Sequence, residues 1–110
     1  MAIAELAGGT QTAVINTEHE LVTDTTGHTA VLVVDTVNMV DGDTLRLRLY
    51  AKVRAGGTER LAYEAWFAHI QDEILKYCIP IPANISIRAT LMQDDGVGRD
   101  FVWALLSLDS

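Results

Sequence analysis

The alternation of apolar and polar side chains between residues 44 and 68 is the feature that most limits how this chain can fold. From residue 45 to residue 53 every second side chain is leucine, alanine or valine. The side chains between them are Arg46, Arg48, Tyr50, Lys52 and Arg54. The alternation returns over 61–67, after the pair Gly56-Gly57. A period of two buries one face of an extended chain and leaves the other in water, so the stretch predicts a β-hairpin with a basic wet face.

The loop of this hairpin sets which residues face each other. A three-residue loop, Gly56 to Thr58, matches the apolar side chains best, because a slip of one residue exchanges the two faces of a strand. This register pairs Leu47 with Phe67, Ala51 with Tyr63 and Val53 with Leu61. On the wet face it pairs Tyr50 with Glu64, and Arg48 with Trp66 in a cation–π contact.

A helix over residues 59–77 is the competing interpretation of the second half of this stretch. Ala62, Trp66, Ile70 and Ile74 lie four residues apart, as one stripe of a helix requires. A shorter helical turn, Asp72 to Lys76, is compatible with either interpretation. The periodicity alone leaves both open.

Other segments also read as strands separated by turns. Residues 29–35 are nearly all valine and leucine, as in a central strand, and residues 84–93 and 99–109 alternate again. Asp35 to Asp43 is compatible with a single helical turn, and the prolines of 77–82 confine that segment to an edge or a loop. Residues 1–11 contain two glycines and little periodicity, which predicts a flexible N-terminal arm. The sequence therefore predicts an all-β, single-domain antiparallel β-sandwich or jelly-roll-like barrel over residues 12–110, with at most a short helical turn.

Charge and composition narrow the classes of partner. The chain of 110 residues has a net charge of −7, and no lysine or arginine precedes Arg46. An acidic protein is a poor candidate for nucleic-acid binding, which neutralises phosphates. The sequence contains no run of about 20 apolar residues, so it predicts no membrane span. Its first residues do not have the pattern of a secretory signal. The single cysteine, Cys78, excludes an internal disulfide and fits a reducing compartment.

The residues that could carry chemistry do not form a recognisable set. His19, His28 and His69 lack the spacing of metal ligands. The turns 41–43 and 94–96 hold aspartates that could offer oxygen atoms to calcium, but aspartate is favoured in turns for its own sake. Cys78 has no base nearby in the sequence, which favours a small buried side chain over a nucleophile. The sequence therefore predicts no catalytic residue, no cofactor and no metal.

The hairpin carries the strongest candidate for a contact with another molecule. A tryptophan beside arginines on an exposed face is typical of a contact surface. The alternative is that a second sheet or the N-terminal arm covers Trp66, whereas Trp103 shares the parity of Phe101 and Leu105 and is predicted to lie in the core. The predicted partner contacts are Arg46, Arg48, Tyr50, Lys52, Arg54 and Trp66.

Several short strings resemble a family of small virion proteins of tailed bacteriophages. They are residues 23–27 (TDTTG), 34–36 (VDT), 38–43 (NMVDGD), 56–58 (GGT) with 60–63 (RLAY), and Gly98-Arg99 with Phe101 and Trp103. The resemblance covers about residues 18–109. It implies a β-rich structural protein without enzymatic activity, and it favours a strand over Leu61–Phe67. It brings no catalytic or cofactor-binding residues.

The resemblance implies a capsid decoration (cement) protein of the virion, assembled in the host cytoplasm. Its partners would be the major capsid protein and copies of itself, for which a trimer on a symmetry axis is suited. A minor head- or tail-associated protein is the nearest alternative. A carbohydrate-binding module for host attachment, with Trp66 and Tyr50 as stacking platforms, is the alternative of a different class.

Overall fold

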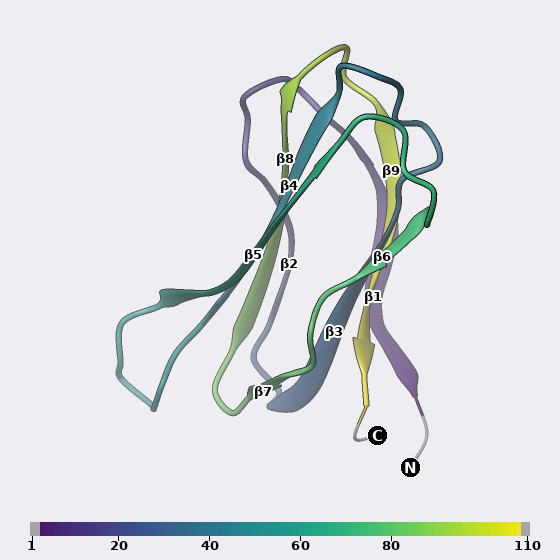
Figure 1. Ribbon diagram of the computed structural model, residues 1–110. Coiled ribbons are helices and arrows are strands. Elements are labelled where there is room, and N and C mark those ends of the chain that lie inside the picture. Colours follow the sequence, from purple (N-terminus) through teal and green to yellow (C-terminus); the bar gives the residue numbers. More distant parts are fainter. Residues whose placement is uncertain (1–2, 109–110) are drawn as a thin grey trace.

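The computed structural model describes residues 3–108 as two antiparallel β-sheets packed face to face (Figure 1). Sheet A has the order β1 (Ala4–Thr12), β9 (Asp100–Ser107), β3 (His28–Asp35) and β6 (Leu75–Tyr77), and β7 (Ile81–Ala83) also pairs with β3. Sheet B has the order β2 (His19–Asp24), β8 (Ile87–Asp95), β4 (Thr44–Ala51) and β5 (Arg60–Ala68). The predicted all-β sandwich is confirmed.

The core lies between the sheets and is built from the strands that alternate most regularly. Strand β4 contributes three leucines, β8 contributes Ala89 and Leu91, and β9 contributes Phe101 and Leu105; all are almost fully buried. Burial of one such large side chain stabilises the fold by about 1.5–3 kcal/mol. Trp103 packs against this core, as predicted.

The central hairpin is confirmed, and the helix over 59–77 is not formed. The register differs from the predicted one: Leu47 lies opposite Ala65, and Phe67 lies opposite Leu45. A bulge between Leu49 and Tyr50 shifts the pairing of the two strands. The pairing ends at Ala51, and the connection to β5 spans residues 52–59. The tight turn lies within this longer loop, where the Gly57 amide donates to the Arg54 carbonyl at 3.0 Å. The pair Gly56-Gly57 correctly predicted the position of the turn but not the length of the loop that contains it.

The predicted flexible arm over 1–11 is wrong for the residues described. Ala4–Thr12 forms the edge strand β1, which pairs with β9 along its whole length and bulges between Glu5 and Ala7. Without β1, one edge of the core strand β9 would lose its hydrogen-bonding partner. The glycines removed the alternation on which the sequence prediction relied, while Leu6 still packs against the core. Residues 1 and 2 of the predicted arm lie outside the described residues.

The short helical turns are not formed in the described chain. Asp35 caps a hydrogen-bonded turn instead: its Oδ1 accepts from the Val37 amide at 3.0 Å, and the Met39 amide donates to the Thr36 carbonyl at 3.1 Å. Within the predicted turn at 72–76, residues 72 and 73 form a bend, and residues 75 and 76 already belong to β6. Pro82 lies in the short edge strand β7, as the proline rule predicted.

Four connections meet at one end of the sandwich, which we call the braced end (residues 13–18, 36–43, 69–74 and 96–99; top of Figure 1). Asp43 is only 1% exposed and lies at its centre. Its Oδ2 accepts from Arg99 Nε at 2.9 Å and from the Val40 amide at 3.0 Å. Gln93 accepts from the Arg99 amide and donates to the Val97 carbonyl. These bonds tie two of the four loops, 36–43 and 96–99, and the end of β8 to one another.

The two remaining loops, 13–18 and 69–74, are joined to this end by backbone amides. The His69 amide donates to the Asp43 carbonyl at 2.9 Å, and the Gly42 amide donates to His69 Nδ1 at 2.9 Å. The Ala13 amide donates to the Arg99 carbonyl, also at 2.9 Å. Asp43 therefore serves the fold, and over residues 3–108 the structure shows no group of three or more potential metal ligands.

Candidate interaction surfaces

The outer face of sheet B carries the predicted basic residues, but acidic neighbours pair with them. Arg46 contacts Asp94 at 3.2 Å, and Arg48 contacts Glu64 at 2.5 Å. Arg88 of β8, which the sequence prediction did not include, contacts Glu59 at 2.9 Å. The predicted basic face is thus a lattice of ion pairs. Glu64 and Glu59 come from the hairpin itself, whereas Asp94 comes from β8, which the hairpin sequence alone could not place beside β4.

Glu18 is the hub of this lattice. Its carboxylate accepts from the hydroxyls of Tyr50 and Thr90, each at 2.6 Å, and Arg48 lies 3.4 Å away. Partial burial on its own raises the pKa of Glu18, but these two hydrogen bonds and the charges of Arg48 and Arg88 outweigh it and leave the pKa below its ordinary value. Burial and the bond to Glu18 raise the pKa of Tyr50. Tyr50 is therefore engaged within the molecule.

Trp66 is exposed, which resolves the alternative that the sequence left open. It is 54% exposed, and the guanidinium of Arg46 lies 3.8 Å from its ring centroid. The predicted partner, Arg48, is wrong because the true register places Arg46 opposite Trp66. Arg88 covers Tyr50 in the same way at 4.1 Å. One face of each ring is thus occupied by an arginine.

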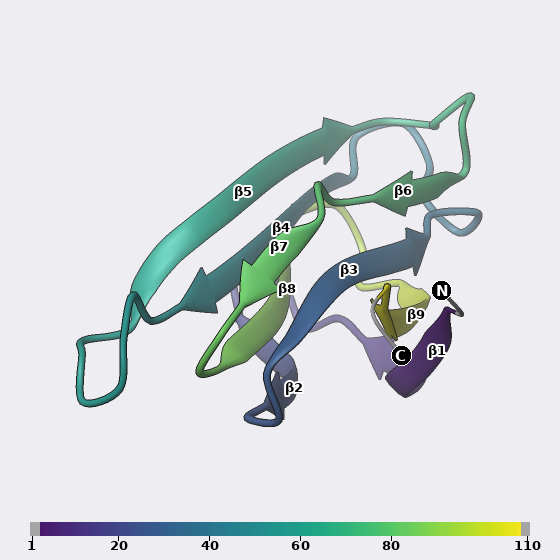
Figure 2. The ribbon, with the colours of Figure 1, turned by 90° about the horizontal axis from the view of Figure 1, so that it is seen from below.

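The hairpin tip, residues 52–58, differs from this lattice. Figures 1 and 2 show it projecting beyond the body of the sandwich, at the end remote from the braced end. Over the chain that the structure describes, Lys52 and Arg54 have no ion pair, and neither has Arg60 at the start of β5. Val53 lies between the two cations and is 86% exposed, the largest value among the exposed apolar side chains. Of the four basic residues among the predicted contacts, Lys52 and Arg54 are therefore the two without an ion pair in the described chain.

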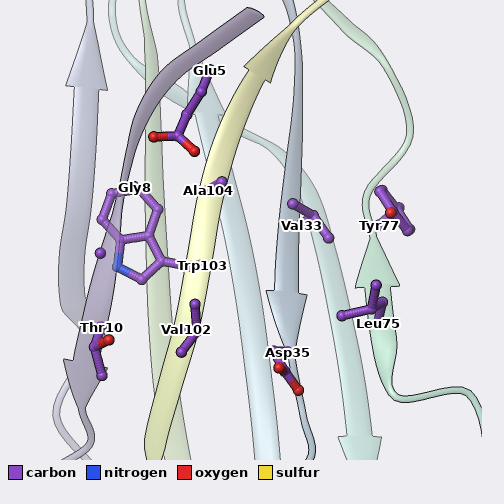
Figure 3. Close-up of a pocket in the computed structure, with 11 residues that line it drawn as sticks. Glu5, Gly8, Thr10, Val33, Asp35, Leu75, Tyr77, Val102, Trp103 and Ala104 are labelled. Carbon is purple, nitrogen blue, oxygen red and sulfur yellow. The ribbon is translucent and has the colours of Figure 1, made fainter. Parts of the chain in front are cut away.

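An open groove of about 460 Å³ lies on the outer face of sheet A (Figure 3). Carboxylates of β1 and β3 flank it, and apolar side chains of β3, β6 and β9 line it. The lining residues are Glu5, Gly8, Gly9, Thr10, Val33, Asp35, Leu75, Tyr77, Val102, Trp103 and Ala104. No lysine or arginine is among them. Sequence reasoning missed this groove because β1 and β6 were not predicted as strands.

Comparisons with known proteins place the chain in no family. No protein-family model, no curated protein and no solved structure matches it. The resemblance to phage virion proteins accordingly stays a prediction. Within residues 3–108 no helix has the length and apolar character needed to span a membrane.

Proposed function

We propose that this protein is a structural component of a bacteriophage virion, a capsid decoration (cement) protein that binds the outer surface of the shell and stabilises it. The sequence resemblance suggests this role, and the surface supports binding to other proteins. The single observation that carries the proposal is the placement of exposed apolar side chains. Val37, Ile70 and Val97 are exposed on three loops of the braced end. Such groups mark contact sites when they gather on a folded surface.

The braced end suits a contact with a rigid shell. Val97 and Ile70 are more than half exposed there, although their loops are fixed by Asp43, Arg99 and His69. Loops that are already ordered lose little conformational entropy on binding. A ligand that binds only the assembled shell stabilises it by mass action, so no catalytic step is needed.

Host-attachment by carbohydrate binding is the second candidate, and the exposure of Trp66 favours it. An exposed indole can stack on a sugar ring. Arg46 covers one face of the ring, and Trp66 Nε1 donates to Glu64 at 3.1 Å. Only the other face of the indole is therefore free, and Tyr50 is engaged by Glu18 and Arg88.

Reconstitution of phage heads separates these roles. Heads that lack the protein are heated with and without the purified chain, and bound copies are counted by quantitative mass spectrometry. The proposal predicts hundreds of copies per head and a higher temperature of head disruption. Val97→Asp at the braced end is expected to weaken head binding at least about tenfold by placing a charge in an apolar contact.

The other outcomes contradict the proposal. A handful of copies per virion indicates a minor head or tail component. Binding to host polysaccharide that Trp66→Ala abolishes and Val97→Asp leaves intact indicates the attachment role. No binding to heads at all rules out a decoration protein.

A further inference from the structure

The hairpin tip presents an apolar side chain between two free cations. Lys52, Val53 and Arg54 follow one another in the chain, and none of the three has a side-chain hydrogen bond or ion pair in the part of the protein that the structure describes. A valine that is 86% exposed contributes almost nothing to the core of its own molecule. An exposed apolar side chain between two unpaired cations is the composition expected of a surface that contacts another molecule.

The groove on sheet A presents the complementary pattern. Figure 3 shows Glu5 near one end, Asp35 near the other, and Ala104 and Val33 between them. Glu5 pairs with Leu106, and the neighbour of Asp35, Val34, pairs with Trp103. The two residues are thus offset by about four residues along β9, or about 13 Å at 3.3 Å per residue. Because β1 and β3 lie on opposite sides of β9, they are also about 10 Å apart across the strands, which separates their backbones by about 16 Å.

The spacing of the cations can match that of the carboxylates. Residues 53 and 54 form a bend, so the backbones of Lys52 and Arg54 lie at most about 7 Å apart, the span of two extended residues. Lys52 and Arg54 both have long, flexible side chains that can reach outward from Val53. Because the bend interrupts the alternation of an extended strand, Val53 can lie over the apolar centre of the groove while each cation reaches toward one carboxylate.

The tip cannot reach the groove of its own molecule. The tip belongs to sheet B and projects from one end of it, whereas the groove lies on the outer face of sheet A. Figures 1 and 2 place the tip far from β1, β9 and β6 in both views. The match therefore requires two molecules.

We propose that copies of this chain associate head to tail, with the hairpin tip of one copy seated in the sheet A groove of the next. The net charge of −7 makes two copies repel each other in most orientations. Contact between the free cations and the cation-free groove is the orientation in which this repulsion is relieved. Both halves of the contact are on one chain, which favours a second copy over an unrelated partner. The contact is heterologous, so it closes into a ring or continues as an open chain.

This inference goes beyond the decoration role and does not rest on it. A head-to-tail contact can form in dilute solution without a capsid. Its failure is therefore separable from a failure of head binding.

Sedimentation of the purified chain over a range of concentrations and salt tests the contact. The wild type is expected to form oligomers that salt weakens, because exposed charges are screened. The tip variant Lys52→Glu/Arg54→Glu is expected to associate at least about tenfold more weakly, since like charges then face each other. The groove variant Glu5→Lys/Asp35→Asn is expected to do the same, and asparagine keeps the oxygen that accepts from the Val37 amide.

A combined variant and a matched control make the test specific. The chain that carries all four substitutions has a negative tip and a positive groove end, so its association is expected to recover at least about tenfold. Asp72→Asn/Glu73→Lys makes the same charge change as the groove variant, but at the braced end, and is expected to associate like the wild type. Ala104→Trp fills the groove without changing its charge and is also expected to weaken association. Thermal melts verify that each variant folds.

Three results overturn the proposal. The first is a wild type that stays monomeric up to about 1 mM, the range of the weakest specific contacts. The second is association that the tip and groove variants leave unchanged. The third is a combined variant that does not regain the association lost in the tip variant and in the groove variant.

Discussion

The two ends of the sandwich are built in opposite ways. At the braced end, a buried aspartate, an arginine and a glutamine tie the loops together through short hydrogen bonds. At the hairpin tip, Val53 and Arg54 are exposed and Lys52 is half-buried, and none of the three side chains has such a bond to the rest of the described chain. One end holds the fold, and the other leaves its side chains to a partner. Substitutions at the two ends should therefore change different properties of the protein.

Removal of the central carboxylate of the braced end is expected to have the largest effect on stability. Asp43→Ala leaves Arg99 and the Val40 amide without their partner in a buried site. The free energy of unfolding is expected to fall by about 3 kcal/mol. Urea unfolding measures this change.

Asp41→Ala is the matched control in the same loop. Asp41 is exposed, and among the described residues its side chain accepts a single hydrogen bond, from the Ile70 amide at 3.4 Å. Its loss is expected to change stability by less than about 1 kcal/mol. Equal effects of the two substitutions would contradict the central role of Asp43.

The glycine at 98 tests how closely the loops approach each other. A Cβ atom on Gly98 would lie 2.1 Å from the Ala13 carbonyl oxygen, so the two loops must separate. We expect Gly98→Ala to destabilise the protein by about 2 kcal/mol. Gly42→Ala is the comparison, because a Cβ there meets nothing within 4 Å and only the positive φ of 98° opposes it. That variant is expected to lose about 1 kcal/mol, and a reversed order would refute close contact between the loops.

The ion pairs on sheet B are partly exposed but hydrogen-bonded. Substitutions there should therefore lower the stability by less than those at the braced end and by more than those at the hairpin tip. Glu18→Gln removes the charge that accepts from Tyr50 and Thr90 and is expected to lower stability by about 1 kcal/mol at neutral pH, after allowance for solvent screening. The pKa of Glu18 is below its ordinary 4.5 in the folded protein, so its charge stabilises the fold above that pH.

The same lowered pKa predicts the pH dependence of this difference. As the pH falls below 4.5 and through the folded pKa, the wild type loses the contribution of Glu18. The stability gap between wild type and Glu18→Gln should therefore shrink on acidification, as urea unfolding at neutral and at acid pH can measure. A gap that widens in acid would show that the lattice does not depend on the charged carboxylate.

Substitutions at the tip are expected to have the smallest effect on folding. Val53→Asp and Arg54→Ala should each change the free energy of unfolding by less than about 0.5 kcal/mol, since neither side chain is packed. The same substitutions should weaken association between copies. A large loss of stability would mean that the tip packs on its own molecule, and the contrast between the ends would fail.

The strands with regular alternation could be predicted from the sequence, and the glycine-containing edge could not. Leu45, Leu47 and Leu49 predict a buried face because a polar residue separates each leucine from the next. Gly8 and Gly9 give no such signal, although the backbone of β9 holds them in an extended strand. Periodicity reports on side-chain burial, and a strand fixed by backbone pairing can lack it.

The candidate surfaces depended on strand order, which local patterns do not reveal. The sequence identified Lys52, Arg54 and Trp66 as exposed contacts. It could not show that Asp94 lies beside Arg46, 48 residues away in the chain, or that Glu18 lies beside Thr90. Neutralisation of the basic face and formation of the groove both follow from pairing between distant strands. The resemblance to virion proteins suggested a role but located neither surface.

Disulfide trapping between two variants that each carry one introduced cysteine tests most directly whether the tip is a partner contact. Val53→Cys at the tip is mixed with Ala104→Cys on the groove floor under mild oxidation, while Cys78 stays buried. The account predicts rapid formation of a cross-linked dimer, and much slower cross-linking when Val97→Cys at the braced end replaces the tip variant. Cross-linking of the tip variant no faster than that of Val97→Cys would contradict it.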